Sequence, residues 1–429
     1  MRLEINDFAK IKNVDIIVDG ITVIAGENNT GKSTVGKILF SLFNAVSGIE
    51  DKIVKQRIRE IEQSSMLIMR NHLHNDGLRR SSIRNATKKI SLQISSLLDE
   101  QDDLDHSQIY CIIEKSIAPL LMDGVIDGGQ ELCDDLTKKI EEILALPENT
   151  IMLEILSRYF NGVFHGQINS LINQGMNATL NLNIKNKDVN LTFNSNECIK
   201  FNAEISLLHK SIYIDNPFII DSLNSYDDLN TIDEFLRNLL ISTAKDDIMA
   251  GIIETVLAKE KLSEIYKALQ SIVDGQIIIK NDDEFYLEKE GFAQPISFNN
   301  LSTGLKSFVI IKMLVEKGII KEKDILILDE PEIHLHPQWQ IAYAELVVLL
   351  QKYFDLSIVV TTHSPYFLDA INLFSIKHGV NDKVNYYISS MENNSVTMSC
   401  VNGNIDLIYQ KMASPIQMLD SLRYELSEK

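Results

Sequence analysis

Hydrophobic and polar residues alternate over the first part of the chain, and this pattern predicts β-strands. Residues 2–8 and 14–18 show the alternation, and Asp19-Gly20 has the composition of a hairpin turn. Residues 21–25 are largely apolar, which predicts a buried strand, and residues 34–43 have the hydrophobic spacing of a helix. The start of the chain therefore predicts a β-hairpin, a buried strand and a helix.

From about residue 48 the pattern becomes helical and polar. Short apolar runs at helical spacing, as in residues 92–98 and 140–146, predict packed helices, and the chain lacks the sustained heptads of a long coiled coil. Short strands are expected near residues 178–216. We therefore predict that residues 48–272 form a mainly helical insertion with a short β segment.

The last third of the chain alternates between apolar strands and helices. The expected elements are strands at residues 324–328 and 357–361, helices at 307–317, 338–350 and 415–426, and a hairpin within 384–401. Buried strands that alternate with helices are typical of an α/β sheet. We predict one α/β domain, formed by residues 1–47 and 273–429 and split by the insertion.

The residues from Gly26 to Ser33 have the pattern Gly-x-x-x-x-Gly-Lys-Ser of a phosphate-binding loop. The loop lies between a predicted buried strand and a helix, which is the setting it requires. Glycine permits the tight wrap of the backbone, and the N-terminus of the following helix attracts phosphate. Lys32 is expected to reach the β- and γ-phosphates of ATP, and Ser33 to bind Mg²⁺. The predicted nucleotide-binding residues here are Gly26, Asn28, Asn29, Thr30, Gly31, Lys32, Ser33 and Thr34.

Two later motifs predict hydrolytic chemistry. Asp329 and Glu330 end an aliphatic strand, where adjacent carboxylates are costly unless a cation lies opposite. We predict that Asp329 holds Mg²⁺ through water and that Glu330 is the general base for the attacking water. His363 ends the next apolar strand and is expected to donate a hydrogen bond to the γ-phosphate. His334 and His336 lack a ligand framework, so we expect a subunit-contact loop there instead of a metal site.

The segment Leu301-Ser302-Thr303-Gly304 precedes a predicted helix. In isolation, Ser302 would indicate only an N-cap for that helix. Between a phosphate loop and an Asp-Glu strand, the same segment predicts a signature loop. Ser302 and Gly304 would then bind the γ-phosphate of ATP held by a partner subunit. Hydrolysis would require two heads with ATP between them, so we expect a homodimer or a higher oligomer.

Composition limits the class of protein and its compartment. The 429 residues have a formal net charge of −19, which argues against a surface that coats nucleic acid non-specifically. Two basic stretches, residues 52–59 and 79–89, are interpreted as solvated helix faces, with a DNA or protein contact as the alternative. The absence of a long apolar run or signal peptide, and four widely separated cysteines, predict a cytoplasmic protein without a membrane contact.

Together, these segments resemble the OLD-type (overcoming lysogenization defect) ABC ATPases, which are relatives of the RecF and SMC heads. The matching residues are 3–8, 23–34, 328–337 and 361–365. His336 stands where transporter-type ABC proteins usually have the Asp of a Leu-Asp pair, as is typical of the OLD-like group. OLD nucleases have a C-terminal Toprim domain with an Asp-x-Asp motif. The residues after His363 contain no such motif, so the resemblance implies a stand-alone ABC-type ATPase head.

Stand-alone OLD-like ATPases often resemble the ATPase partners of bacterial antiphage systems such as Septu and PARIS, in which the ATPase holds a separately encoded nuclease or Toprim effector. The resemblance therefore implies a slow, regulatory ATPase that uses ATP and Mg²⁺, dimerises head to head, and controls an effector, with a nuclease favoured. The alternative is a RecF- or SMC-like ATPase that clamps DNA, for which the basic stretches are the only support. A transporter motor is disfavoured, because the long insertion replaces the compact helical subdomain of transporter heads.

Overall fold

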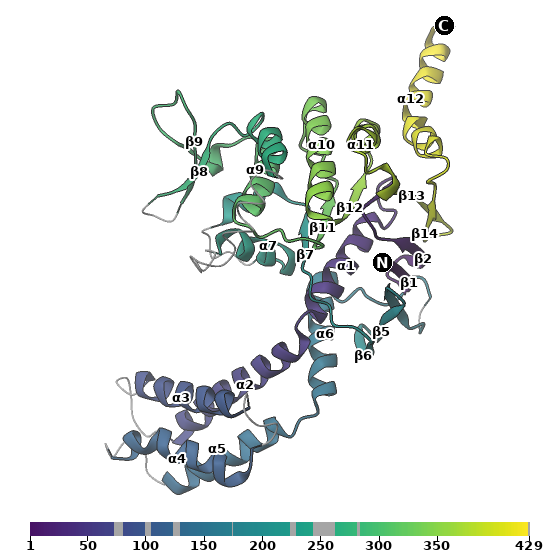
Figure 1. Ribbon diagram of the computed structural model, residues 1–429. Helices are drawn as coiled ribbons and strands as arrows, with labels where there is room; N and C mark the ends of the chain where they lie inside the picture. Colours follow the sequence, from purple (N-terminus) through teal and green to yellow (C-terminus); the bar gives the residue numbers. More distant parts are fainter. Residues whose placement is uncertain are drawn as a thin grey trace. The chain divides into compact units, whose positions relative to one another are not determined.

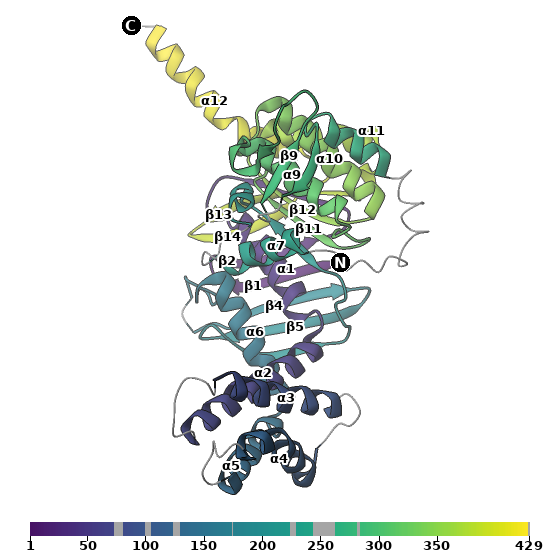
Figure 2. The same ribbon diagram turned by 90° about the vertical axis from the view of Figure 1, so that its left-hand side faces the viewer.

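The computed structural model describes residues 1–72, 80–98, 104–122, 129–173, 175–223, 229–242, 262–280 and 284–427 (Figures 1 and 2). The chain forms two compact units. The first unit contains Met1–Ser47 and Leu156–Lys429, and the second contains Gly48–Ile155. The second unit therefore interrupts the first in the sequence.

The first unit contains an 11-stranded sheet with the order β6-β5-β4-β1-β2-β14-β13-β3-β12-β11-β7. Neighbouring strands at one end of this sheet run parallel: β13 (Val384–Glu392), β3 (Ile21–Gly26), β12 (Ser357–Thr362), β11 (Ile325–Asp329) and β7 (Ser211–Ile214). The remaining strands are joined mainly by antiparallel pairing: β1 (Arg2–Phe8), β2 (Ile11–Ile17), β14 (Ser395–Cys400), β4 (Ala178–Ile184), β5 (Lys187–Asn194) and β6 (Glu197–Ala203). Because the first five strands are parallel, their carboxyl ends meet at one edge of the sheet.

Two features of this sheet differ from the predictions. The hairpin turn predicted at Asp19-Gly20 is wrong, because β2 pairs with β1 and β14 whereas β3 pairs with β12 and β13. Every residue of β3 is buried, as is usual for a parallel strand covered on both faces. The sequence also predicts one insertion over residues 48–272. In the structure the separate unit ends at Ile155, and β4 to β7 belong to the main sheet.

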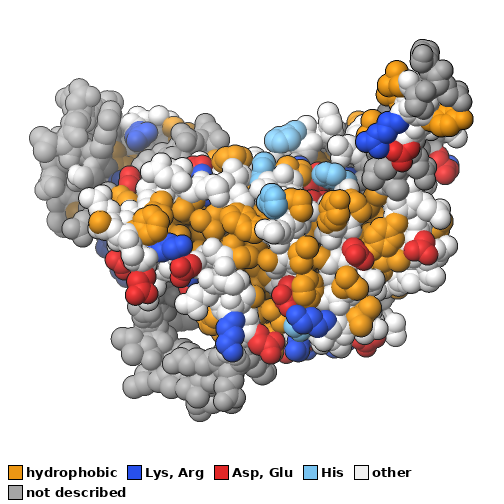
Figure 3. Space-filling view, turned by 90° about the horizontal axis from the view of Figure 1, so that it is seen from above, with side chains coloured by type: hydrophobic (Ala, Val, Ile, Leu, Met, Phe, Trp, Pro, Cys, Tyr) orange, Lys and Arg blue, Asp and Glu red, His pale blue; other side chains and the backbone are white. Residues whose placement is uncertain are grey.

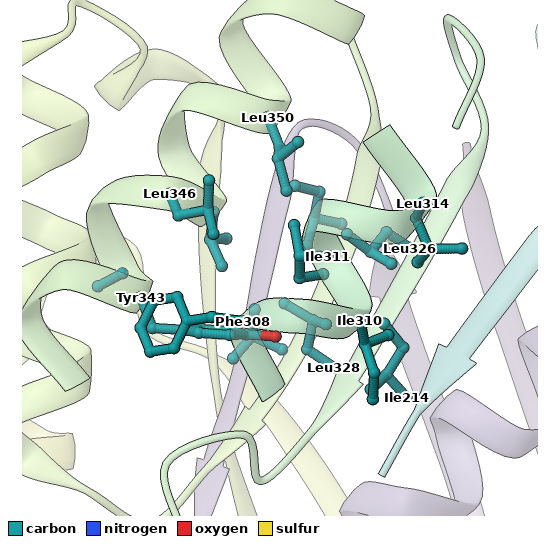
Figure 4. Close-up of a cluster of buried hydrophobic side chains, with 14 of the residues drawn as sticks. Ile214, Phe308, Ile310, Ile311, Leu314, Leu326, Leu328, Tyr343, Leu346 and Leu350 are labelled. Atoms are coloured by element: carbon teal, nitrogen blue, oxygen red, sulfur yellow. The ribbon is translucent and has the colours of Figure 1, made fainter. Parts of the chain in front are cut away.

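Helices cover both faces of the parallel strands. The core on one face contains side chains of α9 (Thr303–Glu316), α10 (Pro337–Phe354) and α11 (Pro365–Lys377). Figure 4 shows part of this core, where side chains of β7 and β11 lie against α9 and α10. Successive strand residues point to opposite faces, so Ile327 lies on the other side, against Gly36 of α1 (Lys32–Val46). The helix that follows the phosphate loop is thus packed directly on β11.

Smaller elements complete the first unit. A second sheet contains three antiparallel strands: β8 (Gln276–Ile279), β9 (Phe285–Glu288) and β10 (Ile296–Ser297). The helical elements are η1 (Pro217–Ser222), α7 (Thr231–Ile241), residues 262–270, η2 (Phe298–Asn300), η3 (Asn381–Lys383) and α12 (Asp406–Ser427). Helix α12 begins before the predicted helix at residues 415–426. None of the helices in the described ranges is both long and apolar enough to cross a membrane.

The second unit is helical. It contains α2 (Ile49–His72), α3 (Arg80–Leu98), α4 (His106–Met122), α5 (Gly129–Leu144) and the start of α6 (Glu148–Phe164). Helix α5 shows how its core forms, because Leu132, Leu136 and Ile140 recur at helical spacing and are buried. In the predicted basic stretch 52–59, Arg57 donates a hydrogen bond to the Leu146 carbonyl at 2.8 Å. Arg79 of the other basic stretch lies outside the described residues.

Candidate functional site

The loops that follow β3, β11 and β12 meet at the carboxyl edge of the parallel sheet. Strand β12 lies between β3 and β11, with Thr362 paired to Ala25 on one side and Thr361 paired to Asp329 on the other. Motifs that are far apart in the sequence therefore lie together. The predicted residues joined by contacts at this edge are Lys32, Ser33, Asp329, Glu330 and His363.

The phosphate loop runs from Gly26 at the end of β3 into the first turn of α1. Gly31 has a left-handed backbone, with φ of 75°, which glycine adopts at little cost. The Thr30 hydroxyl donates to the Glu27 carbonyl at 2.7 Å and fixes the turn. The first turn of α1 contains no acidic residue, and no side chain caps its N-terminus. Its free backbone N–H groups and positive helix end are therefore suited to bind an anion.

Lys32 is buried among oxygen atoms, with only 3% of its side chain exposed. Its ammonium group donates to the carbonyls of Gly26 at 3.1 Å and Glu27 at 2.8 Å. The same group lies 3.2 Å from Oε1 of Glu330. A buried ammonium ion is costly without such acceptors. Phosphate oxygens are acceptors of the same kind, so Lys32 is placed to exchange these partners for a phosphate.

Asp329 is held by hydroxyl groups at the end of β11. Ser33 donates to its Oδ1 atom at 3.0 Å, and Tyr213 donates to its Oδ2 atom at 2.6 Å. The Thr361 hydroxyl also donates to Oδ1. Hydroxyl and carboxylate oxygens are the ligands that Mg²⁺ prefers, and Mg²⁺ usually takes only one or two protein ligands beside phosphates. Ser33 and Asp329 therefore fit the predicted metal site, although the described residues contain no cluster of three His, Cys, Asp or Glu side chains.

Glu330 lies between Lys32 and His363. Its Oε2 atom is 3.6 Å from Nδ1 of His363, and its backbone N–H donates to the Thr361 carbonyl at 3.1 Å. The backbone of Glu330 has φ of 49°, a left-handed conformation that is unusual outside glycine and often marks a functional site. The carboxylate is 20% exposed, so it can meet a water molecule while Lys32 stays buried beside it. A partly exposed carboxylate is compatible with the predicted role of Glu330 as a general base.

Glu332 is a buried acid whose role the sequence motifs did not indicate. Its side chain is 2% exposed, and burial raises its pKa. Its Oε1 atom accepts hydrogen bonds from the Thr362 hydroxyl and from the backbone N–H groups of His363 at 2.9 Å and Ser364 at 3.2 Å. The Glu332 side chain thus joins the loop after β11 to the backbone of the loop after β12 at His363.

Strand β7 brings two further residues to the site that the motifs did not identify. Tyr213 binds Asp329, and Asp215 follows the strand directly after Ile214, which pairs with Leu328. Burial, together with Asp233 and Asp329, raises the pKa of Asp215 to about 6. The only local signal in the sequence for these two residues was the predicted strand at residues 211–214, which Asp215 follows.

The predicted signature segment lies at the start of α9. Ser302 occupies the N-cap position and is exposed, but its hydroxyl makes no capping hydrogen bond. Gly304 packs tightly, because a Cβ atom there would lie 2.9 Å from the His334 carbonyl and 3.0 Å from the ring of Trp339. Within the described residues, no hydrogen bond joins Ser302 or Gly304 to the phosphate loop of the same chain. His336 serves as the N-cap of α10 by accepting from the backbone N–H of Gln338.

A pocket of about 290 Å³ opens beside the phosphate loop. Gly26, Glu27, Asn28 and His363 line it together with Ile388 of β13 and with Ile408, Lys411 and Met412 of α12. Lys411 donates to the Ser389 carbonyl at 3.0 Å and to the Ser390 hydroxyl at 3.1 Å. The first turns of α12 therefore line the pocket beside the phosphate loop, although the sequence predicted a helix only at residues 415–426.

Figure 3 shows histidine side chains gathered near the middle of one face of the molecule, with hydrophobic side chains beside them.

Known proteins are similar to parts of this chain. A family model described as AAA ATPase domain matches residues 1–368. Septu protein PtuA of Bacillus thuringiensis is 27% identical over 195 residues, which cover 42% of this chain and 47% of that protein. Septu protein PtuA of Bacillus mycoides (strain KBAB4) is 31% identical over 117 residues, which cover 25% of this chain and 16% of that protein. The resemblance inferred from the motifs, to ATPases such as those of Septu, is confirmed by these relatives, although the chain spans about half or less of their length.

Solved structures of SMC head domains are also similar. An SMC head bound to the C-winged helix domain of ScpA has a TM-score of 0.44 and 12% identity, with 95% of this chain and 98% of that chain covered. The SMC head domain from Thermotoga maritima has a TM-score of 0.38 and 11% identity, with coverage of 93% and 98%.

Proposed function

Because the chain belongs to the AAA ATPase domain family, we propose that it binds ATP with Mg²⁺ at the phosphate loop, dimerises head to head around the nucleotide and hydrolyses it slowly. The main support is the convergence of Lys32, Ser33, Asp329, Glu330 and His363 at one edge of the sheet. The cycle would control a separately encoded effector, with a nuclease in antiphage defence as the favoured case.

Binding would begin at the N-terminus of α1. The uncapped N–H groups of α1 and the wrapped phosphate loop would hold the phosphates, and Lys32 would exchange its carbonyl partners for phosphate oxygens. Ser33 and Asp329 would hold Mg²⁺, which, when bound, offsets the negative charge of the phosphates. Tyr213 and Thr361 would keep the Asp329 carboxylate in place through their hydroxyl hydrogen bonds.

Hydrolysis would depend on Glu330 and His363. The Glu330 carboxylate would orient a water molecule and accept its proton, while His363 would donate a hydrogen bond to the γ-phosphate. Ser302 of a second copy would complete the site, since its exposed hydroxyl is not used for capping. A site completed in this way makes ATP part of the contact between two heads.

The effector role is supported by the similarity to Septu protein PtuA, which covers less than half of this chain. The alternative is a DNA clamp, for which Lys55, Arg59, Arg84 and Lys88 of the two basic stretches are exposed, whereas Arg57 is engaged within the chain. Arg57 lies in the basic stretch 52–59, but its guanidinium group bonds to the Leu146 carbonyl and lies 3.5 Å from Glu148. The same side chain is therefore not fully available to a phosphate backbone.

The proposal is tested with a tagged Glu330→Gln chain produced together with its native neighbouring genes. This variant is expected to hold ATP and to stay dimeric, because it keeps the phosphate contacts but loses the base. Recovery of a nuclease-like neighbour in a defined complex, dependent on ATP, would support the effector role. ATP-dependent and salt-sensitive recovery of DNA alone would instead favour the clamp. Normal ATP turnover by the Glu330→Gln chain would contradict the catalytic assignment itself.

A further inference from the structure

The buried carboxylate of Glu332 has no part in the mechanism above, yet it is tightly bound. Its Oε1 atom accepts hydrogen bonds from three donors: the Thr362 hydroxyl and the backbone N–H groups of His363 and Ser364. One oxygen atom of this side chain thus accepts from three separate donors of the loop after β12. These bonds therefore hold the backbone at His363 firmly against the loop that follows β11.

A second set of bonds ties the same two loops. The Ser364 hydroxyl donates to Oε1 of Gln340 at 2.8 Å, and the Gln340 amide donates to the carbonyls of Glu332 at 3.3 Å and Leu335 at 3.1 Å. Gln340 lies in α10, so the loops after β11 and β12 share one network with this helix. Hydrogen bonds from Gln340 and Glu332 thus hold the backbone next to His363 in place.

The second carboxylate oxygen of Glu332 makes this residue unusual. Oε2 is buried and has no hydrogen-bond partner among the described residues. Burying an unpartnered oxygen is costly. An amide in the same place could accept the same bonds at Oε1 but would bury an unpartnered NH2 group in place of Oε2. Neither side chain would be fully satisfied, so hydrogen bonding alone gives no reason for an acid at this position.

The imidazole of His363 offers such a reason. Its Nδ1 atom lies 3.7 Å from Oε1 of Glu332 and 3.6 Å from Oε2 of Glu330, and the side chain is 44% exposed. Two carboxylates beside Nδ1 favour a hydrogen on that nitrogen. A ligand would then meet the Nε2 side of the ring, while the two carboxylates hold the Nδ1 side.

We propose that Glu332 is a positioning residue that holds His363 for its contact with the γ-phosphate. Glu332 fixes the backbone of His363 through Oε1 and places its carboxyl group 3.7 Å from Nδ1 of the ring. This inference rests on the function proposed above for His363. If it holds, a residue of the loop after β11 positions a residue of the loop after β12.

The test compares Glu332→Gln, His363→Ala and the double variant in the full chain. We expect each single variant to lower kcat about tenfold or more, with KM for ATP within about twofold of the original, because the phosphate loop is untouched. The double variant should be no slower than His363→Ala, since Glu332 acts through His363. The pH profile of kcat should change in Glu332→Gln but not in Glu345→Gln. Glu345 is a matched control, because its Oε1 atom also bonds a histidine, His378, at 3.2 Å in a different part of the fold.

The outcomes distinguish failure of the role proposed for His363 from failure of the inference about Glu332. If His363→Ala hydrolyses ATP normally, the proposed role of His363 fails. If His363→Ala is impaired but Glu332→Gln is normal, or if their losses multiply in the double variant, the inference about Glu332 fails alone. Melting temperatures report whether Glu332→Gln folds. If it does not, Thr362→Val removes one donor from Oε1 and should lower kcat in the same direction by a smaller factor; an unchanged kcat would contradict the inference.

Discussion

Lys32 is bound by two backbone carbonyls and by Glu330, and these are partners that a nucleotide would replace. We expect Lys32→Ala to weaken ATP binding about a hundredfold, since hydrogen bonds to charged groups contribute roughly 1.5–3 kcal/mol each. Isothermal titration calorimetry with ATP and Mg²⁺ measures this change. Retained affinity would contradict the assignment of the phosphate loop.

A second buried lysine provides the control for this experiment. Lys312 of α9 donates to the Gly275 carbonyl at 2.5 Å and lies in the core, where it binds no part of the phosphate loop. Lys312→Ala should lower the free energy of unfolding and leave ATP affinity unchanged. The comparison separates the loss of a buried ammonium group from the loss of a phosphate ligand.

Asp215 predicts a pH dependence of stability. Its pKa is raised from 3.8 to about 6 by burial and by Asp233 and Asp329, while Lys37 opposes the shift. Between about pH 4 and pH 6 the folded chain keeps a proton that the unfolded chain releases, so the free energy of unfolding falls as the pH rises through this window. The side chain keeps contact with solvent, so we expect a decrease of only about 1 kcal/mol. Urea denaturation at pH 4.5 and 6.5 should show a decrease that is about 1 kcal/mol smaller in Asp215→Asn than in the original chain, because Glu332 and Asp233 also have raised pKa values and remain in both.

At the scale of elements, the contact between α1 and β11 depends on Gly36. A Cβ atom at this position would lie 2.8 Å from Cγ2 of Ile327 and 3.0 Å from Cε2 of Tyr213. Gly36→Ala should therefore destabilise the fold by about 1–3 kcal/mol and displace the tyrosine that binds Asp329. Thermal unfolding and ATP turnover measure the two effects. Gly403→Ala is the matched control, because a Cβ atom there meets nothing within 4 Å; equal effects of both changes would contradict the argument.

The elements around the site could be predicted because their signals are local. An apolar strand before Gly26, a second before Asp329 and a third before His363 predict three buried strands whose ends meet in a parallel sheet. The partners of those residues could not be predicted in the same way. Tyr213 reaches Asp329 only because β7 pairs with β11, and Glu332 reaches the backbone of His363 only through tertiary packing.

Strand pairing over long sequence distances also explains the differences in domain organisation. The strands near residues 178–216 have the expected alternation, but no local pattern shows that β4 pairs with β1. The same limit applies to Asp19-Gly20, where a turn-like pair joins two strands that have different partners. Local sequence thus predicts the strands, and the sheet order determines which unit they join.

At the scale of the whole molecule, the proposed dimer predicts complementation between two inactive chains. Ser302→Arg should bind ATP without hydrolysing it, because it disables the partner's site, whereas Lys32→Ala disables its own site. In a mixed dimer the Ser302→Arg chain retains its phosphate loop and receives an intact signature segment. Equal mixing should restore about a quarter of the original activity, since half of the dimers are mixed and each has one complete site. Steady-state ATP hydrolysis measures this recovery, and the absence of any recovery would contradict a site shared between two copies.

The position of β3 in the sheet has a consequence for the synthesis of the protein. The ribosome makes this strand and its phosphate loop before its neighbours in the sheet, β12 and β13, which begin only at Ser357 and Val384. A nascent chain therefore holds the loop without its carboxylates or its histidine until synthesis has passed His363. Prematurely terminated products would carry the nucleotide-binding motif without a nucleotide site. Only chains that extend past β13 could form the complete nucleotide site proposed above.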